Sequence, residues 1–173
     1  MIRRESAFAP LSLPITIRPA IAKDGDGIAR TFLESAEHHA SLDPARYAVP
    51  SIAELSARYR DGQQNPPGAA EGVTLVAELG GEIVGFVDAR LDRSPDPMHR
   101  KLLYCAIVEI AVCRQHKCQG IGGRLLQAAE AWGREHGADY ASLEYLAANT
   151  RASDFYQRRM GYEPAHITAI KRL

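Results

Sequence analysis

The chain has 173 residues, enough for one domain with its own hydrophobic core. Lys plus Arg equal Asp plus Glu at 21 each, and no basic block occurs, which argues against binding to nucleic acid or to an anionic membrane. No apolar run approaches the roughly 18 residues that cross a bilayer. Prolines interrupt the apolar N-terminal stretch, so it lacks the pattern of a signal peptide. The number of cysteines, three, is odd, and we expect reduced thiols in a cytoplasmic protein.

The N-terminal part of the chain is predicted to contain a strand and a helix. Residues 15–20 (ITIRPA) alternate in the manner of a strand, and residues 1–13 before them are interpreted as an N-terminal extension. An aspartate of the stretch KDGDG can cap the helix that follows, which carries Ile28, Phe32 and Leu33 on one side. This side is expected to face the core.

A second helix and a β-hairpin are expected next. Residues 51–60 begin with Ser51 and have Glu54 three residues later, which is the pattern of a capping box. A loop rich in Pro and Gly separates this helix from two β-rich runs over residues 73–90. A Gly-Gly pair between the two runs suits a tight hairpin turn.

The second half of the chain is predicted to alternate strands with helices. Residues 102–112 (LLYCAIVEIAV) are long, apolar and β-branched, as is typical of a buried central strand. Four further elements follow: a helix over 120–137, a strand over 139–146, a helix beginning at Asn149 or Thr150, and a last strand over 165–173. The order predicts a mixed α/β fold in which the two strands of the 102–146 crossover run parallel.

A glycine cluster lies where the central strand ends and the next helix begins. The stretch KCQGIGGRLL (117–126) has three glycines within four residues, flanked by Lys117 and Arg124. A helix start presents unpaired N–H groups and a partial positive charge, and glycine lets an anion approach them closely. Strand, glycines, helix and basic flanks together predict an anion site rather than a plain turn.

Two nucleotide-binding motifs fit this cluster less well. A P-loop would close with Gly-Lys-Ser or Gly-Lys-Thr, whereas this chain has Gly123-Arg124-Leu125. A dinucleotide fingerprint would place a third glycine at Leu125, although an acidic residue does follow about 20 positions later, at Glu144. A dinucleotide-dependent enzyme therefore stays open as a third interpretation.

The stretch VEIAVCRQHKCQGIGGRLL closely resembles the acetyl-CoA-binding motif of the GNAT superfamily of N-acetyltransferases. That motif is Arg/Gln-x-x-Gly-x-Gly/Ala after a strand, and it stands here as Lys117-Cys118-Gln119-Gly120-Ile121-Gly122. The later motif of the family resembles a second set of residues, which are Asn149, Ala152, Phe155, Tyr156, Gly161 and Tyr162. The resemblance covers nearly the whole chain from about residue 14.

The resemblance implies a GNAT domain over residues 14–173, with a central mixed sheet of six to seven strands flanked by about four helices. Two positions depart from the family pattern. Lys117 replaces the usual Arg or Gln, which keeps the charge and loses the fork geometry. Cys118 replaces a common Gly and would be strained if the position needs a positive φ. We expect cofactor binding to survive, because the glycines remain.

The resemblance also implies roles for individual residues. Backbone groups of Ile110, Ala111 and Val112 would pair with the pantetheine arm of acetyl-CoA, and the Val112 N–H would stabilise the oxyanion at the thioester. The pyrophosphate would lie on the glycine cluster, which comprises Lys117, Cys118, Gln119, Gly120, Ile121, Gly122, Gly123 and Arg124. Asn149 would bind the cofactor arm. Tyr156 would protonate the leaving thiolate, although outside this family pattern it would be interpreted as one more core aromatic.

The acceptor amine must lose a proton, and two carboxylates are candidates for the base. Glu109 and Glu144 each lie in an otherwise apolar strand, where burial would raise a carboxyl pKa toward a useful range. Each could instead face outward and take no part. By resemblance Glu144 aligns with a glutamate that some family members use, and it is placed slightly ahead.

Three other groups of residues have weaker claims. Cys113, His116 and Cys118 lie close together, but a structural zinc site usually draws on two separated pairs, and we predict no metal. A Cys nucleophile with a His base has no supporting motif. A polar stretch lies after the first helix and is either part of the acceptor site or a solvated helix end: Glu34, Glu37, His38, His39 and Asp43.

Two classes of function remain open beside the dinucleotide enzyme. The first is an enzyme that transfers acetyl from acetyl-CoA to a primary amine of a small molecule or protein by direct attack. The second is a catalytically weak module that binds or senses acyl-CoA. The expected partners are acetyl-CoA and an amine, with a homodimer possible by analogy. Residues 24–70 and 91–101 would shape the acceptor site, and their sequence does not identify the acceptor.

Overall fold

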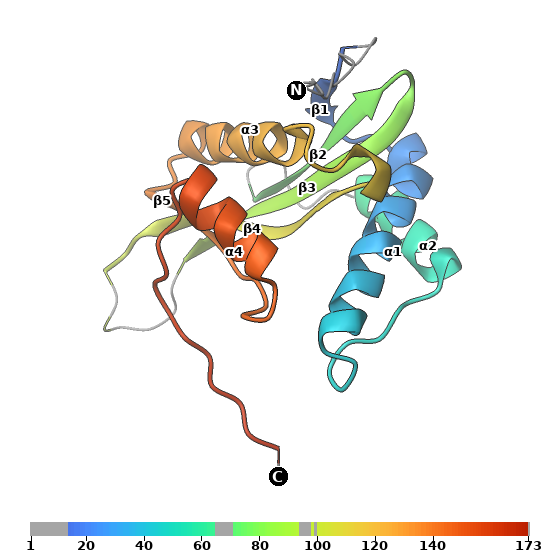
Figure 1. Ribbon diagram of the computed structural model, residues 1–173. Coiled ribbons are helices and arrows are strands. Elements are labelled where there is room, and N and C mark those ends of the chain that lie inside the picture. Colours follow the sequence, from blue (N-terminus) through green and yellow to red (C-terminus); the bar gives the residue numbers. More distant parts are fainter. Residues whose placement is uncertain (1–13, 65–70, 94–97, 99, 173) are drawn as a thin grey trace, which may run out of the picture.

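The computed structural model describes residues 14–64, 71–93, 98 and 100–172. Its centre is a five-stranded sheet in the order β1-β2-β3-β4-β5 (Figure 1). The strands are β1 (Thr16–Pro19), β2 (Gly72–Leu79), β3 (Glu82–Arg93), β4 (Leu103–Val112) and β5 (Tyr140–Leu143). Neighbouring strands are antiparallel except β4 and β5, which are parallel as predicted for a crossover. The fold is therefore the mixed α/β class that the order of elements predicts.

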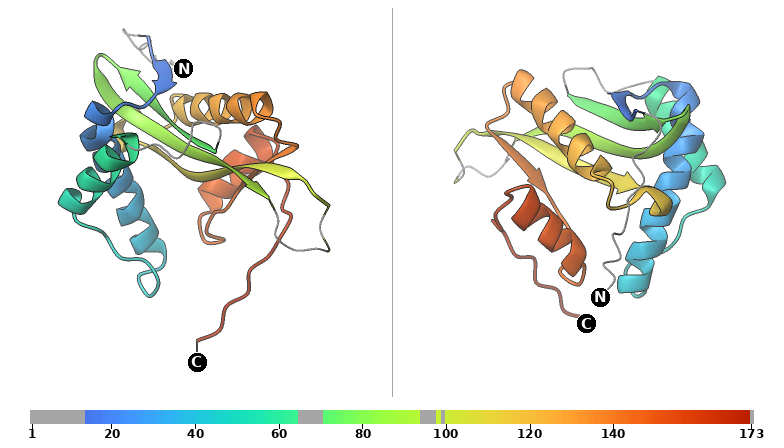
Figure 2. Two further views of the ribbon diagram at one scale, coloured as in Figure 1. Left: turned by 180° about the vertical axis from the view of Figure 1, so that it is seen from behind. Right: turned by 45° about the horizontal axis from the view of Figure 1, so that its top comes forward.

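Helices cover both faces of the sheet (Figures 1 and 2). On one face, α1 (Gly25–Leu42) and α2 (Ile52–Gln64) pack against apolar side chains of the strands around Phe86. On the other face, α3 (Ile121–Glu135) packs against a second core around Val87. The two cores alternate along β3 because successive side chains of a strand point to opposite faces.

Local sequence signals explain how these elements begin and turn. At the start of α2, the Ser51 N–H donates to Glu54 Oε2 at 3.1 Å and the Glu54 N–H donates to Ser51 Oγ at 3.3 Å, so the predicted capping box forms. Between β2 and β3, Gly80 has φ 60° and Gly81 has φ 86°. Both values are positive, as a type I′ hairpin turn requires, which explains the Gly-Gly pair.

The pairing between β4 and β5 ends early, which opens the sheet beside β4. β5 pairs with β4 only from Tyr104 to Ile107, while β4 continues to Val112. The ladder between β3 and β4 shifts register at the same point, because Asp88 pairs with Glu109 and Ala89 with Ile107. Val108 is thus the extra residue of a β-bulge, and it bends β4 where its second neighbour is lost.

The C-terminal helical segment lies beyond this opening. α4 (Thr150–Asp154) continues directly into the π-helical segment η3 (Phe155–Arg159). Two 3-10 turns complete the helices: η1 (Ala22–Asp24) before α1, and η2 (Arg114–His116) after β4. No helix in the described part of the chain is long and apolar enough to cross a membrane.

The predicted strand over residues 165–173 does not form, so the sheet has five strands and not the six to seven expected. Within the described residues, the chain after Met160 has no regular secondary structure. A strand needs a neighbour for its backbone groups, and this segment runs away from its own sheet (Figure 1). The proposed N-terminal extension, residues 1–13, lies outside the described residues.

Candidate active site

The free edge of β4 presents backbone groups to the opening in the sheet. The Cys113 N–H donates to Val84 O of β3 at 2.9 Å. Consecutive N–H groups of a strand point to opposite sides, so the Val112 and Ile110 N–H groups point away from β3. No strand among the described residues pairs with that side of β4 beyond Ile107. An extended ligand arm can therefore hydrogen-bond there as an added strand.

The glycine cluster forms a concave turn at the start of α3. Cys118 has φ 64° and is the only non-glycine residue with a positive φ in the described chain, and Gly120 has φ 80°. The predicted departure from family glycine at Cys118 therefore does place a cysteine in the left-handed region. Gly120 is the N-cap of α3 and provides no side chain to cap it, so the first N–H groups of the helix face outward.

Both the backbone N–H and the guanidinium of Arg124 have partners within the chain. Its N–H donates to Gly120 O at 3.1 Å inside the helix, and its guanidinium donates to Ile15 O at 2.8 Å. Positive charge comes instead from Lys117, and from Arg151 of α4, whose guanidinium lies 2.7 Å from Cys118 Sγ. Sequence reasoning missed Arg151, because its position beside the turn depends on how α4 docks.

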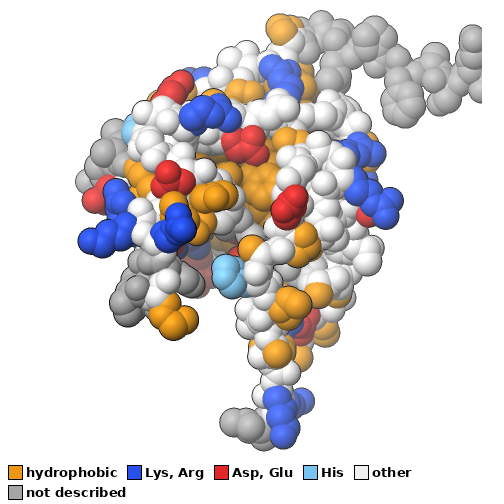
Figure 3. Space-filling view, turned by 90° about the vertical axis from the view of Figure 1, so that its left-hand side faces the viewer, with side chains coloured by type: hydrophobic (Ala, Val, Ile, Leu, Met, Phe, Trp, Pro, Cys, Tyr) orange, Lys and Arg blue, Asp and Glu red, His pale blue; other side chains and the backbone are white. Residues whose placement is uncertain are grey.

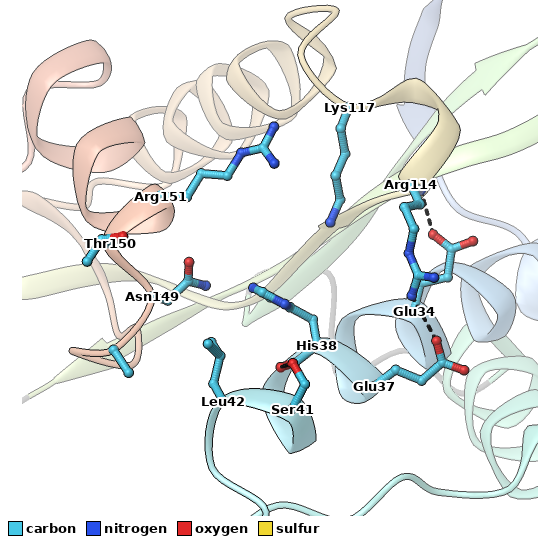
Figure 4. Close-up of a pocket in the computed structure, with 11 residues that line it drawn as sticks. Glu34, Glu37, His38, Ser41, Leu42, Arg114, Lys117, Asn149, Thr150 and Arg151 are labelled. Atoms are coloured by element: carbon cyan, nitrogen blue, oxygen red, sulfur yellow. Dashed lines mark hydrogen bonds and ion pairs between the residues drawn. The ribbon is translucent and has the colours of Figure 1, made fainter.

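A cavity of about 570 Å³ lies beside the turn, between α1 and the start of α4 (Figure 4). It is lined by Glu34, Glu37, His38, Ser41 and Leu42 of α1, by Arg114 and Lys117, and by Ala148, Asn149, Thr150 and Arg151. In Figure 4 the side chains of Lys117, His38 and Asn149 converge on its centre. Residues that the sequence assigned to the cofactor and to the acceptor region therefore share one cavity.

Much of the polar stretch on α1 is used to hold the turn after β4. Glu34 accepts a hydrogen bond from the Arg114 N–H, and Glu37 forms an ion pair with the Arg114 guanidinium at 2.9 Å. His39 and Asp43 do not line the cavity, and Asp43 pairs with Arg46. Burial and then the nearby Lys117 ammonium lower the pKa of His38, which favours its neutral form inside the cavity.

Asn149 has a structural role that also orients it. Its Oδ1 accepts a hydrogen bond from the Ala152 N–H at 3.1 Å and caps α4. The cap fixes the side chain at the cavity wall with its amide nitrogen directed toward His38 (Figure 4). A donor is thereby held at the position where the sequence predicted a contact to the cofactor arm.

Glu109 and Asp88 form a mostly buried acidic pair on the α1 and α2 side of the sheet. Burial, followed by the charge of Asp88, raises the pKa of Glu109 to about 7. Burial also raises the pKa of Asp88, whose Oδ1 is buried without a hydrogen-bond partner in the described structure. The Tyr59 hydroxyl is likewise buried and unpaired, and its side chain is 4% exposed. An acid among the apolar residues of EIVGFVDAR is the signal that could have identified Asp88.

Tyr156 lies near Glu109 but on the C-terminal helical segment. Burial, and secondarily the charge of Glu109, raises the pKa of Tyr156 to about 12, so the phenol stays protonated at neutral pH. Its ring contacts those of Tyr145 and Phe155 at centroid distances of 5.5 and 5.1 Å. The ring therefore packs as the core interpretation expects, and the hydroxyl keeps the proton that the catalytic interpretation requires.

Glu144 has a different environment from Glu109. It follows the last residue of β5 and is exposed. The burial on which its selection as a base depended is therefore absent, whereas Glu109 has it. β5 is only four residues long. For so short a strand, apolar neighbours in the sequence do not show whether a residue lies inside the strand or just past its end.

The cysteines occupy separate environments. Cys113 Sγ lies 3.2 Å from Thr31 Oγ1, Cys118 Sγ contacts Arg151, and Cys105 is buried against α3. All three are free thiols. The described residues contain no cluster of three or more His, Cys, Asp or Glu side chains arranged to hold a metal ion.

An open strand edge beside a glycine-rich helix start is an arrangement that can hold an extended ligand with an anionic end. The model of the acetyltransferase (GNAT) family matches residues 46–162, which is more than half of the chain. The chain belongs to this family. The family assignment agrees with the resemblance that the sequence motifs indicated.

Individual relatives agree with this assignment. The catalytic subunit NAA10 of the N-terminal acetyltransferase A complex of Arabidopsis thaliana is 30% identical over 96 residues, covering 55% of this chain and 47% of that protein. The uncharacterized N-acetyltransferase YhfO of Bacillus subtilis (strain 168) is 32% identical over 93 residues, covering 54% and 60%. The chain therefore spans about half the length of these curated relatives.

Solved structures share the fold. A tetramutant of the BH1408 protein from Bacillus halodurans matches with a TM-score of 0.81 at 21% identity, covering 91% of this chain and 99% of that one. The likeness covers a larger part of the chain than the family match does.

Proposed function

We propose that this protein transfers the acetyl group of acetyl-CoA to a primary amine by direct attack, without a covalent enzyme intermediate. The observation that carries the proposal is that two ionisable groups lie beside the free edge of β4. Glu109 can accept a proton there, and Tyr156 can donate one. The pKa of Glu109, about 7, suits a base at neutral pH, and that of Tyr156, about 12, suits a proton donor.

The donor would lie along β4 with its phosphates on the glycine turn. The free edge offers the N–H groups of Ile110 and Val112 to the pantetheine arm, and the start of α3 offers N–H groups to the pyrophosphate. Lys117 and Arg151 supply positive charge beside that turn. The amide of Asn149 is oriented toward the arm by its capping bond to Ala152.

The reaction then needs three proton movements around one nucleophilic attack. The ionised Glu109 takes a proton from the acceptor ammonium, directly or through water, and the neutral amine attacks the thioester carbonyl. The Val112 N–H stabilises the oxyanion. When the carbon–sulfur bond breaks, Tyr156 gives its proton to the CoA thiolate, and the tyrosinate regains a proton from the attacking nitrogen, which then carries the single hydrogen of the amide product. An amine with a pKa near 10.4 is almost fully protonated at pH 7, so the first transfer is the step that Glu109 accelerates.

The acceptor is proposed here only as a primary amine of a small molecule or protein. The cavity between α1 and α4 adjoins the turn that would bind the donor phosphates, and its α1 wall would receive the acceptor. His38, held neutral by burial, can accept a hydrogen bond from such an amine. A weak acyl-CoA-binding module remains the alternative, because strain at Cys118 affects the turn that receives the phosphates.

The test is release of CoA thiol from acetyl-CoA in the presence of a panel of primary amines, with acetyl-CoA binding measured separately by calorimetry. We expect binding together with amine-dependent thiol release. Glu109→Gln should lower the rate by about 100-fold or more. Glu144→Gln is the matched control, because it makes the same change at the exposed carboxylate.

The outcomes separate the interpretations. Binding of acetyl-CoA with no thiol release from any amine would favour the binding module. Binding of NADH in place of acetyl-CoA would favour the dinucleotide enzyme. A larger loss in Glu144→Gln than in Glu109→Gln would transfer the role of base to Glu144.

A further inference from the structure

The acidic pair formed by Asp88 and Glu109 differs from the acids at the surface. On the face in Figure 3, Asp and Glu side chains lie apart from one another, with Lys and Arg side chains among them. Asp88 and Glu109 are instead direct cross-strand partners, and both are mostly buried. Two carboxyl groups so close together and away from water need hydrogen-bond donors if either is to ionise.

Neighbouring side chains provide one donor to each acid. Thr74, which is opposite Asp88 on β2, hydrogen-bonds to Asp88, and Ser35 of α1 hydrogen-bonds to Glu109. Burial raises the pKa of both acids, and these bonds together with the charge of Arg58 of α2 offset only part of that rise. The Arg58 side chain is exposed, and Asp88 Oδ1 stays buried with no hydrogen-bond partner in the described part of the chain.

A second buried polar atom without a partner lies next to this pair. The Tyr59 hydroxyl of α2 makes no hydrogen bond within the described residues, and the side chain is 4% exposed. The Tyr59 ring packs edge-on against Phe86 at a centroid distance of 5.5 Å, and Phe86 lies two positions before Asp88 on the same face of β3. Burial raises the pKa of Tyr59, and the charges of Asp88 and Glu109 raise it further, so the hydroxyl lies near both acids.

The two unpaired atoms are complementary. The phenol O–H of Tyr59 is a donor, and Asp88 Oδ1 is an acceptor. Burying either atom without a partner is costly, and the two do not bond to each other directly. One water molecule can accept from a phenol and donate to two carboxylates, and buried waters in proteins typically make about three hydrogen bonds. Glu109, next to Asp88, provides the third partner.

We propose that the Tyr59 hydroxyl donates to one bound water, which donates in turn to Asp88 and Glu109 and so holds a carboxylate of the pair in its ionised form. Tyr59 is thus a positioning residue, because it acts on the base through the water and does not touch the substrate. The inference rests on the proposed function in taking Glu109 as the base. With this donor in place, Glu109 gives up its proton at lower pH than burial beside Asp88 would otherwise allow.

The first test is Tyr59→Phe in the full-length protein, because it removes the hydroxyl and keeps the ring that packs on Phe32 and Phe86. Loss of the donor disfavours the carboxylate. We therefore expect the acid limb of kcat/KM for thiol release to shift to higher pH by roughly 0.5–1 unit. Tyr140→Phe is the matched control, since its ring is 59% exposed on β5, and it should leave the limb in place.

Thermal unfolding tests the same contact without any activity. Tyr59 and Tyr156, the phenols near the pair, stay protonated up to pH 9 because burial raises the pKa of each. Tyr59→Phe raises the folded-state pKa of Glu109 further above its unfolded value, so more stability is lost as the pH rises. We expect the Tm of the variant to fall by about 2–5 °C more than that of wild type between pH 4 and pH 9. This extra fall should vanish when Asp88→Asn and Glu109→Gln are both present.

The outcomes separate this inference from the proposed function. If the wild-type protein releases no thiol with any amine, the proposed function fails, and the thermal measurement by itself confirms or overturns the role of Tyr59. An equal change in Tm at pH 4 and pH 9 would overturn it, because a hydroxyl that only packs contributes the same at every pH. A high-resolution crystal structure gives a readout that needs no variant. We expect an ordered water within hydrogen-bond distance of the Tyr59 hydroxyl and Asp88 Oδ1, and its absence there would also overturn the inference.

Discussion

Asp88 of β3 and Glu109 of β4 are direct cross-strand partners, and both carboxyl groups are mostly buried on one face of the sheet. Side chains in such positions have Cβ atoms about 4.5–5.5 Å apart. Two carboxylates at that distance away from water cannot both ionise easily, so the pair retains a proton near neutral pH. The bulge at Val108 next to this pair brings it to the opening beside β4.

Removing the charge of Asp88 should make Glu109 more acidic. Burial is the larger cause of the raised pKa of Glu109 and the charge of Asp88 the second, so Asp88→Asn removes only part of the shift. We expect the acid limb of the pH profile of kcat/KM to shift to lower pH by roughly 0.5–1 pH unit. The measurement is the rate of thiol release from pH 5 to pH 9. An unmoved limb would show that Glu109 titrates independently of Asp88.

The same pair predicts a stability that depends on pH. The pKa of Glu109 is about 7 in the folded state, against about 4.3 for an unperturbed glutamate, so folding favours its protonated form. The stability that this proton contributes is complete below pH 4 and is lost as the pH rises through 7. Glu109→Gln should therefore gain about 3 kcal/mol relative to wild type between pH 4 and pH 8, or roughly 6–12 °C in Tm.

Thermal unfolding of both proteins at pH 4 and pH 8 measures this difference. Glu144→Gln is again the control, because an exposed carboxylate should give no such dependence. If wild type and Glu109→Gln lose stability in parallel as the pH rises, the carboxyl group of Glu109 is not held in its protonated form by the fold.

Tyr156→Phe should separate catalysis from binding. The substitution keeps the ring that packs on Tyr145 and Phe155 and removes only the hydroxyl. We expect kcat to fall by about 100-fold with the calorimetric Kd for acetyl-CoA within about twofold of wild type. Tyr145→Phe, the same change on the neighbouring ring, is the control and should keep most of the activity. An unchanged kcat in Tyr156→Phe would leave the ring with a packing role alone.

Local signals predicted most of the fold, because each was self-contained in the sequence. The Ser51 and Glu54 box, the Gly-Gly hairpin and the capping Asn149 depend on contacts between residues a few positions apart. The glycine cluster was also correctly placed at the start of α3. These features need no knowledge of which distant segments meet.

The errors and omissions involve distant segments or the exposure of single side chains. The pattern of residues 165–173 predicts a strand, but a strand forms only where an edge accepts it, and in the described part of the chain this segment joins no strand. Asp88 becomes significant only once the register pairs it with Glu109. Glu144 differs from Glu109 because β5 ends one residue before it.

Cys118→Gly should improve the phosphate-binding turn. Cys118 adopts φ 64°, a conformation that costs an L-residue roughly 1–2 kcal/mol and a glycine almost nothing. The unfolded chain gains some entropy from the new glycine, so we expect a net stabilisation of about 0.5–1 kcal/mol. The change also releases the Arg151 guanidinium from its contact with Cys118 Sγ, which leaves it available to the pyrophosphate. The Kd for acetyl-CoA should therefore decrease.

Cys118→Ala is the matched variant that distinguishes the two causes. Alanine removes the thiol and its contact with Arg151 but retains the Cβ that disfavours a positive φ. If backbone conformation limits the turn, Gly raises Tm and Ala does not. If the contact between Arg151 and the thiol limits binding, both variants bind acetyl-CoA more tightly and to the same extent by calorimetry. The alanine variant then shows no gain in stability. A Gly variant that neither gains stability nor binds more tightly would show that the turn tolerates cysteine at this position without cost.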